Sequence, residues 1–132
     1  MSKTAVVLLS TRLRPKMFSQ ILTDIENQQI PTGWELVLCV AENATETEEI
    51  YAESTLSQSS LKYRYKVCRE IGYSSPRNIN IDLAKEIDPD LVLITDDDES
   101  LPSYWLTRHI AAHEDLNCEV VAGPTKPSHF FR

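Results

Sequence analysis

Residues 91–106, LVLITDDDESLPSYWL, carry the strongest indication of the fold. The first five of these residues form a continuous apolar run, which is typical of a strand buried on both faces of a parallel sheet. Four acidic side chains, Asp96 to Glu99, follow this run directly. Pro102 then favours the start of a helix. We expect residues 91–95 to form the central strand of a sheet and to end in a carboxylate cluster.

Further apolar runs lie outward from this stretch, and they alternate between two periodicities. Runs that suit strands cover residues 4–10, 34–41, 61–67 and 119–122. Runs with helical spacing cover residues 16–29, 47–57 and 75–87, with a last one after Pro102. This alternation predicts an α/β fold: a mostly parallel, Rossmann-like sheet with helices on both faces. Right-handed crossovers and short loops favour the strand order third, second, first, fourth.

Length and charge limit the uses of this fold. With 132 residues, the chain suits one domain, residues 1–132. The formal net charge of -7 argues against general nucleic-acid binding, which depends on a surface rich in Lys and Arg. No apolar run approaches the roughly 18 residues of a membrane span, and the N-terminus lacks the layout of a signal peptide. We therefore expect a cytoplasmic protein.

Polar side chains are concentrated just after the predicted strands. With this strand order, chain growth reverses direction between the first and fourth strands, and ligands bind in the crevice beyond their carboxyl ends. Thr11, Arg12 and Arg14 follow the first strand, and the acidic run follows the fourth. The residues that follow the second and third strands are Glu42, Asn43, 69–73, Arg77 and Asn78. We expect these groups to surround one ligand site.

The acidic run and the scarcity of glycine together indicate a divalent cation. Adjacent carboxylates repel one another unless solvent or a cation relieves the charge, so a solvated acidic loop is the alternative. The chain has only three glycines and contains neither GxGxxG nor GxxxxGK[ST], the loops that bind phosphate through backbone amides. A diphosphate in this crevice would need Mn²⁺ or Mg²⁺ on the carboxylates of 96–98. It would also need an arginine, and the candidates are Arg12, Arg14 and Arg77.

The cysteines and histidines form no recognised metal motif. Cys39, Cys68 and Cys118 are far apart and odd in number, and each lies in or beside an apolar run. We expect them to be reduced thiols in or near the core. His109 and His113 are one helical turn apart, but no third ligand is evident in the sequence. We expect two ordinary helix-surface histidines.

Five segments of the chain follow a known pattern in order and spacing. They are LLSTRLRP (8–15), LCVAENATET (38–47), IGYSSPRNINIDLA (71–84), LVLITDDDESLPSYWL (91–106) and VVAGP (120–124). Together they resemble the family 2 glycosyltransferases of GT-A fold. The fourth segment is the closest match, because it combines the family's DxD strand with its Pro-x-x-Trp-Leu helix start. The departures from the family's pattern include Arg12, Leu13, Glu42 in place of Asp, and Asn80 in place of Gly.

The resemblance implies that residues 1–132 form the nucleotide-sugar-binding part of such an enzyme. The donor would be a nucleoside-diphosphate sugar, and Mn²⁺ or Mg²⁺ would hold it. By the family's motifs, the donor-binding residues would be Thr11, Arg14, Glu42, Asn43, Arg77, Asp96 and Asp97, and the metal ligands would be Asp96 and Asp98. Glu42 would contact the base or ribose, and Asp98 the metal and diphosphate. The change from Asp to Glu at position 42 leaves base specificity open.

Family members usually continue well beyond the equivalent of Arg132, into a half that carries the acceptor site and the catalytic base. We therefore expect a truncated, fragmentary or split member, with any peripheral membrane association coming from a missing C-terminal part. The acids beyond the fourth strand are poorly placed to act as a base; they are Glu99, Glu114, Asp115 and Glu119. The catalytic residue is unknown, and we expect the chain alone to bind donor but to transfer sugar negligibly to its unknown acceptor.

Two other functions stay open. The first is a non-catalytic module that binds a nucleotide sugar or a metal without the acceptor half. The second is a phosphatase of the haloacid dehalogenase type, because residues 96–101 partly fit its DxDx[TV] motif, in which the first Asp is the nucleophile. That motif normally follows the first strand of its fold, whereas here it follows the fourth.

Overall fold

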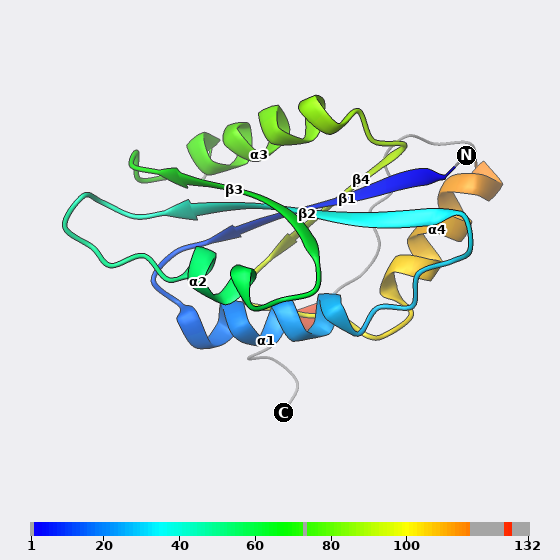
Figure 1. Ribbon diagram of the computed structural model, residues 1–132, viewed down its shortest axis with the longest axis horizontal. Helices are drawn as coiled ribbons and strands as arrows, with labels where there is room; N and C mark the ends of the chain where they lie inside the picture. The colour runs from blue at the N-terminus through cyan, green and yellow to red at the C-terminus, as the bar shows by residue number, and fades with distance from the viewer. Residues whose placement is uncertain (1, 73, 117–125, 128–132) are drawn as a thin grey trace.

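Strands and helices alternate along most of the chain (Figure 1). The computed structural model describes residues 2–72, 74–116 and 126–127. The strands are β1 (Lys3–Thr11), β2 (Trp34–Asn43), β3 (Lys62–Cys68), β4 (Leu91–Asp96), β5 (Glu99–Ser100) and β6 (Lys126–Pro127). The helices are α1 (Pro15–Glu26), α2 (Ala52–Ser57), α3 (Ser74–Ile87) and α4 (Trp105–Leu116).

The four long strands form one parallel sheet in the order β3-β2-β1-β4. This confirms the predicted order and strand direction. The predicted central place of residues 91–95 is wrong for the described residues, where β1 has two neighbours and β4 pairs with β1 alone. An apolar run does not report how many edges of a strand are paired, and here it overstated burial too, because Ile94 of β4 is exposed in the described structure. The strand predicted at residues 119–122 lies outside the described residues.

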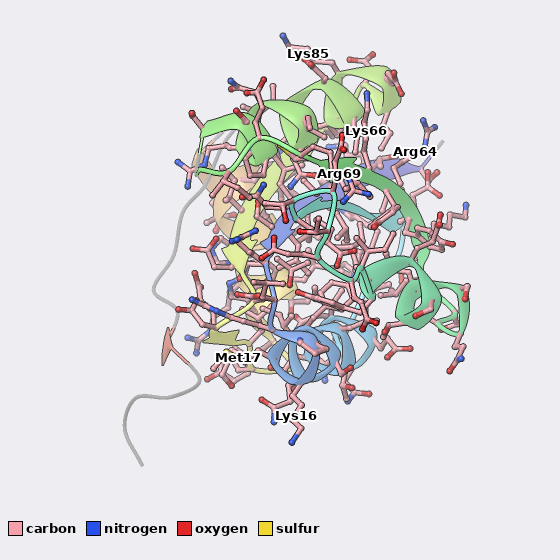
Figure 2. All side chains as sticks on the ribbon, turned by 90° about the vertical axis from the view of Figure 1, so that its left-hand side faces the viewer. Lys16, Met17, Arg64, Lys66, Arg69 and Lys85 are labelled. Atoms are coloured by element: carbon pink, nitrogen blue, oxygen red, sulfur yellow. The ribbon has the colours of Figure 1, made fainter. Side chains whose placement is uncertain are left out.

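Helices cover both faces of the sheet, as predicted. The face that Ala5, Val7 and Leu9 of β1 line packs against α1, α2 and α4. The opposite face, which Val6 and Leu8 line, packs against α3. Both views show α3 on one side of the sheet and α1 on the other, and in Figure 2 Lys85 and Lys16 mark these two sides. Alternate residues of β1 therefore serve two cores, which explains its unbroken apolar run.

The second helix is shorter than predicted, since α2 covers Ala52–Ser57 where the sequence indicated residues 47–57. The backbone N–H groups of Tyr51 and Ala52 donate hydrogen bonds to the buried Glu42 carboxylate, which fixes where the helix begins. Glu48 bonds instead to the backbone N–H of Thr45 and to Arg12. Within the described residues, no helix combines the length and apolarity needed to cross a bilayer.

Ionisable thiol and phenol groups that are buried or partly buried predict that the fold loses stability at alkaline pH. Burial raises the pKa of the Cys39 thiol from 9.0 to about 11, and burial also raises the pKa values of Tyr51 and Tyr65. The unfolded chain ionises first, so stability that is present below pH 9 is lost as the pH rises towards 11. We expect Cys39 to contribute about 2–3 kcal/mol to this fall in the free energy of unfolding.

Urea denaturation at several pH values measures the effect. Cys39→Ala should lower stability at pH 8, because it leaves a small cavity, but its stability should then fall less steeply with pH. Equal pH slopes for the variant and the parent chain would contradict this assignment. The exposed Tyr104 offers a control, because Tyr104→Phe should leave the slope unchanged. Cys68 is also a buried free thiol, as expected, and Cys118 lies outside the described residues.

Candidate functional site

A cavity of about 660 Å³ opens at the carboxyl ends of β1 and β4. This is the crevice position that the strand order predicted, and Figure 2 looks onto this end of the strands. Six of the seven residues predicted to bind the donor line the cavity: Thr11, Arg14, Asn43, Arg77, Asp96 and Asp97. Asp98 lines it as well, whereas Glu42 does not. The structure thus brings most of the predicted site residues together. That these residues bind a donor stays a prediction.

Three carboxylates at the end of β4 converge on a space that suits a cation. Asp96, Asp98 and Glu99 each offer one oxygen, and these oxygens all lie within 4.8 Å of one another. Burial, and then the nearby Asp98 charge, raise the pKa of Asp96, and a bound cation would relieve both costs. Oxygen donors of this kind fit Mn²⁺ or Mg²⁺. The sequence predicted Asp96 and Asp98 as metal ligands, which stays a prediction; it did not include Glu99, whose carboxylate joins theirs because the chain turns at residues 97–98.

Asp97, the middle acid, has different surroundings from its two neighbours. Its side chain is buried, and its Oδ2 accepts a hydrogen bond of 2.8 Å from Thr11 Oγ1. Its Oδ1 accepts one of 3.3 Å from Arg14 Nη1. Burial raises the pKa of Asp97 although the Thr11 hydroxyl opposes the shift. Asp97 therefore ties the acidic turn to the loop after β1 and stands apart from the three carboxylates that converge.

The three candidate arginines differ in how far other residues already engage them. Nη1 of Arg14 lies 3.3 Å from Asp97 Oδ1 and 3.7 Å from Asp98 Oδ2. Nη1 of Arg12 lies 2.9 Å from Glu48 Oε1. Arg77 lines the cavity and is exposed, and no ion pair engages it in the described part of the chain. Its positive charge opposes the rise in the pKa of Asp96, so it is the arginine best placed to meet an anionic ligand beside the carboxylates.

Asn43 shapes the cavity wall through contacts with the loop after β3. Its Nδ2 donates to the carbonyl oxygens of Cys68 at 2.9 Å and Glu70 at 2.7 Å. The backbone N–H of Gly72 donates to its Oδ1 at 3.3 Å. Gly72 has a φ of 146°, a conformation that favours glycine. Asn43 thus lies at the predicted site, and its polar atoms hold the backbone that borders it.

Glu42 is the predicted binding residue that the structure keeps away from the cavity. Its side chain is fully buried. Its two oxygens accept hydrogen bonds from the backbone N–H groups of Tyr51 (3.0 Å) and Ala52 (3.1 Å). Oε1 also accepts one from the Tyr65 hydroxyl at 2.6 Å. The carboxylate at this position therefore fixes the start of α2, and the expected contact with a base or ribose stays a prediction that this geometry does not favour.

Three exposed apolar side chains are among the residues that line the cavity, and the sequence, although it placed residues 69–73 at the site, gave no apolar side chain a role there. Leu13, Ile71 and Ile94 are 49%, 52% and 52% exposed, respectively. Leu13 has a φ of 51°, a left-handed conformation that is uncommon for a residue other than glycine. They come from separate segments, so no local pattern in the sequence could have grouped them. A cavity with apolar walls beside carboxylates suits a ligand that combines an apolar face with an anionic group only when a cation lies between that group and the carboxylates.

The histidines of α4 are not part of this site. His109 is buried, with Nδ1 2.8 Å from the carbonyl oxygen of Trp105, so the prediction of a surface histidine is wrong for this residue. Its ring centroid lies 5.1 Å from that of Trp105. His113 packs edge-on against Trp34. The cause is the packing of α4, because one turn of a helix brings residues 105, 109 and 113 onto the same side.

Comparisons with known proteins bear on the fold. No protein-family model matches the chain, and no curated protein matches it. The crystal structure of S. aureus TarS 1–349 matches with a TM-score of 0.65 and 21% identity, over 86% of this chain and 32% of that chain. A second S. aureus TarS structure gives 0.67 and 20%, over 87% and 20%. TarS 1–349 in complex with UDP-GlcNAc gives 0.64 and 19%, over 86% and 31%.

TarS is a glycosyltransferase of GT-A fold that is similar to family 2. This chain has the GT-A fold. At 19–21% identity, the likeness shows the fold alone. The chain spans between a fifth and a third of the TarS chains that it matches. The parallel sheet with helices on both faces and the GT-A likeness together confirm the α/β architecture that the sequence predicted.

Proposed function

We propose that this GT-A chain binds a nucleoside-diphosphate sugar through Mn²⁺ or Mg²⁺, as the donor-binding part of a glycosyltransferase. The observation that carries the proposal is the convergence of Asp96, Asp98 and Glu99, of which Asp96 and Asp98 line a cavity whose other walls are partly apolar. A nucleoside diphosphate has a base with apolar faces and a strongly anionic diphosphate, which match these two parts. A TarS structure holds UDP-GlcNAc, so uridine nucleotides are the first donors to test.

Each part of the site has a distinct task in this proposal. Asp96, Asp98 and Glu99 would hold the cation, and Arg77 would add positive charge beside them. When bound, the cation would neutralise the charge that develops on the departing diphosphate. The half-exposed Leu13 and Ile71 would contact the faces of the base and exclude water from it. These groups bind and orient the donor, which is how such a site lowers the barrier to a displacement.

Isothermal titration calorimetry of the purified chain with UDP and with UDP-GlcNAc tests the proposal. We expect heat of binding in the presence of Mn²⁺, and we expect it to disappear when a chelator removes the metal. The physical reason is that the acidic turn repels a diphosphate unless a cation lies between them. A panel of purine and other pyrimidine nucleotides in the same buffer examines base specificity. Equal affinity with and without metal, or no binding by any nucleotide, would refute the proposal.

A donor-binding module without transferase activity is the second candidate, and one observation favours it. In the part of the chain that the structure describes, the carboxylates that line the cavity are Asp96, Asp97 and Asp98. All three belong to the turn proposed to meet the diphosphate, so they offer no separate base on the acceptor side, where a general base must act. Incubation with labelled donors and a panel of acceptors distinguishes the two, because a module binds UDP-GlcNAc in calorimetry without producing transfer.

A further inference from the structure

A chain of hydrogen bonds joins the start of α2 to the acidic turn after β4. The Tyr51 hydroxyl lies 2.6 Å from Thr11 Oγ1, and Thr11 Oγ1 lies 2.8 Å from Asp97 Oδ2. The backbone N–H of Arg14 donates to the same Tyr51 hydroxyl at 3.0 Å. Thr11 is 40 positions from Tyr51 and 86 positions from Asp97 in the sequence. The hydroxyl groups of Tyr51 and Thr11 thereby connect three distant segments.

The direction of each bond in this chain follows from the chemistry of its ends. An ionised carboxylate only accepts hydrogen bonds, so Thr11 must use its single hydroxyl proton to reach Asp97. Tyr51 must then donate to Thr11, while its oxygen accepts from the Arg14 backbone. Each hydroxyl in such a chain polarises the next, which strengthens the final bond to the carboxylate.

Tyr51 is itself held firmly from the side away from the acids. Its backbone N–H donates to the buried Glu42 carboxylate at 3.0 Å. Its ring packs edge-on against Phe18 of α1, with 5.9 Å between the ring centroids, and Phe18 is fully buried. The backbone and ring of Tyr51 are therefore held in place, so its hydroxyl has a fixed position. A residue that positions other groups requires this.

The far end of the chain determines where the carboxylates point. Asp97 lies between Asp96 and Asp98 in a two-residue turn. The Thr11 bond holds Asp97 inward, against the loop after β1, whereas the oxygens of Asp96 and Asp98 converge with that of Glu99. If Asp97 rotated freely, the turn and the carboxylates on both sides of it would lose this arrangement.

We propose that Tyr51 is a positioning residue for the metal-binding carboxylates, acting through Thr11 and Asp97. This inference rests on the proposed function in that the cation is assigned to Asp96, Asp98 and Glu99. It goes beyond that function by adding Tyr51, the N-cap residue of α2, which contacts none of these three carboxylates. The only group it needs is the Tyr51 hydroxyl, so a single-atom change tests it.

The experiment compares Tyr51→Phe with the parent chain by electron paramagnetic resonance of Mn²⁺, with and without UDP. The variant keeps the ring that packs on Phe18 and loses only the hydroxyl. We expect Mn²⁺ affinity to fall about three- to tenfold, which is the range that one net hydrogen bond supports. We also expect the double variant Tyr51→Phe with Thr11→Val to bind no more weakly than Thr11→Val alone, because both changes break the same chain.

Tyr65→Phe is the matched control, because it removes a hydroxyl that bonds to the same Glu42 carboxylate but is not linked to Asp97. It should lower the thermal midpoint and leave Mn²⁺ affinity unchanged. Weakened Mn²⁺ binding in Tyr51→Phe with no UDP binding in the parent chain would uphold the positioning role and refute the donor. Unchanged Mn²⁺ affinity in Tyr51→Phe, equal weakening in Tyr65→Phe, or no Mn²⁺ binding by the parent chain would overturn the inference.

Discussion

Replacing Asp98 by alanine should abolish the Mn²⁺-dependent part of UDP binding. Asp98 supplies one of the three converging oxygens, and its removal takes away one of the few anionic ligands that this site offers to a hard cation. Loss of residues that only support metal ligands typically costs 10–100-fold in metal affinity. We therefore expect the apparent affinity for UDP with Mn²⁺ to fall by at least about 100-fold, to the level measured in chelator.

The measurement is the same calorimetric titration, run beside a matched control. Asp82→Ala removes an exposed carboxylate of α3 and should leave UDP binding unchanged, which separates a local effect from the change in net charge. The thermal midpoint of Asp98→Ala should not fall, because removing Asp98 also removes a repulsion that raises the pKa values of Asp96 and Asp97. If Asp98→Ala bound UDP and Mn²⁺ as well as the parent chain does, the assigned cation site would be wrong.

Replacing Glu42 by alanine should cost the fold much more than it costs the site. The change would leave three donors without their acceptor: the backbone N–H groups of Tyr51 and Ala52 and the Tyr65 hydroxyl. A buried donor left without a partner costs about 1–3 kcal/mol, and the lost side chain leaves a cavity. We expect the free energy of unfolding to fall by about 3–5 kcal/mol, as measured by urea denaturation.

A second variant, Glu42→Gln, discriminates between two roles for residue 42. If Glu42 contacted the nucleotide base, as the family resemblance implies, the more conservative Glu42→Gln would weaken UDP binding while the fold kept most of its stability. The observed contacts predict the opposite result: Glu42→Gln should lower the free energy of unfolding, and the folded molecules should keep their affinity for UDP. Glu49→Ala, which removes an exposed carboxylate from the loop that follows β2, should change neither quantity.

Local sequence predicted the α/β class, the parallel direction and the strand order, but not the edge position of β4 among the described residues. Apolar runs with a strand period or a helical period report which side chains leave water, and a short chain can join parallel strands in few ways. The order β3-β2-β1-β4 and the position of the acids beyond β4 followed from these constraints. The same constraints located the cavity at the carboxyl ends of β1 and β4, because a reversal in strand order leaves a crevice there.

Only the tertiary structure decided what each polar group does within that crevice. Asp96, Asp97 and Asp98 are identical in the sequence, yet Asp97 turns inward because Thr11 and Arg14 lie on that side. Glu42 lies where the motif predicted a ligand contact, yet it fixes α2, since no spacing in the sequence reveals that three donors converge on it. The direction of a side chain at the end of a strand depends on partners supplied by distant segments. For that reason the sequence predicted where the cavity lies, and contacts with distant segments determined which of the polar side chains line it.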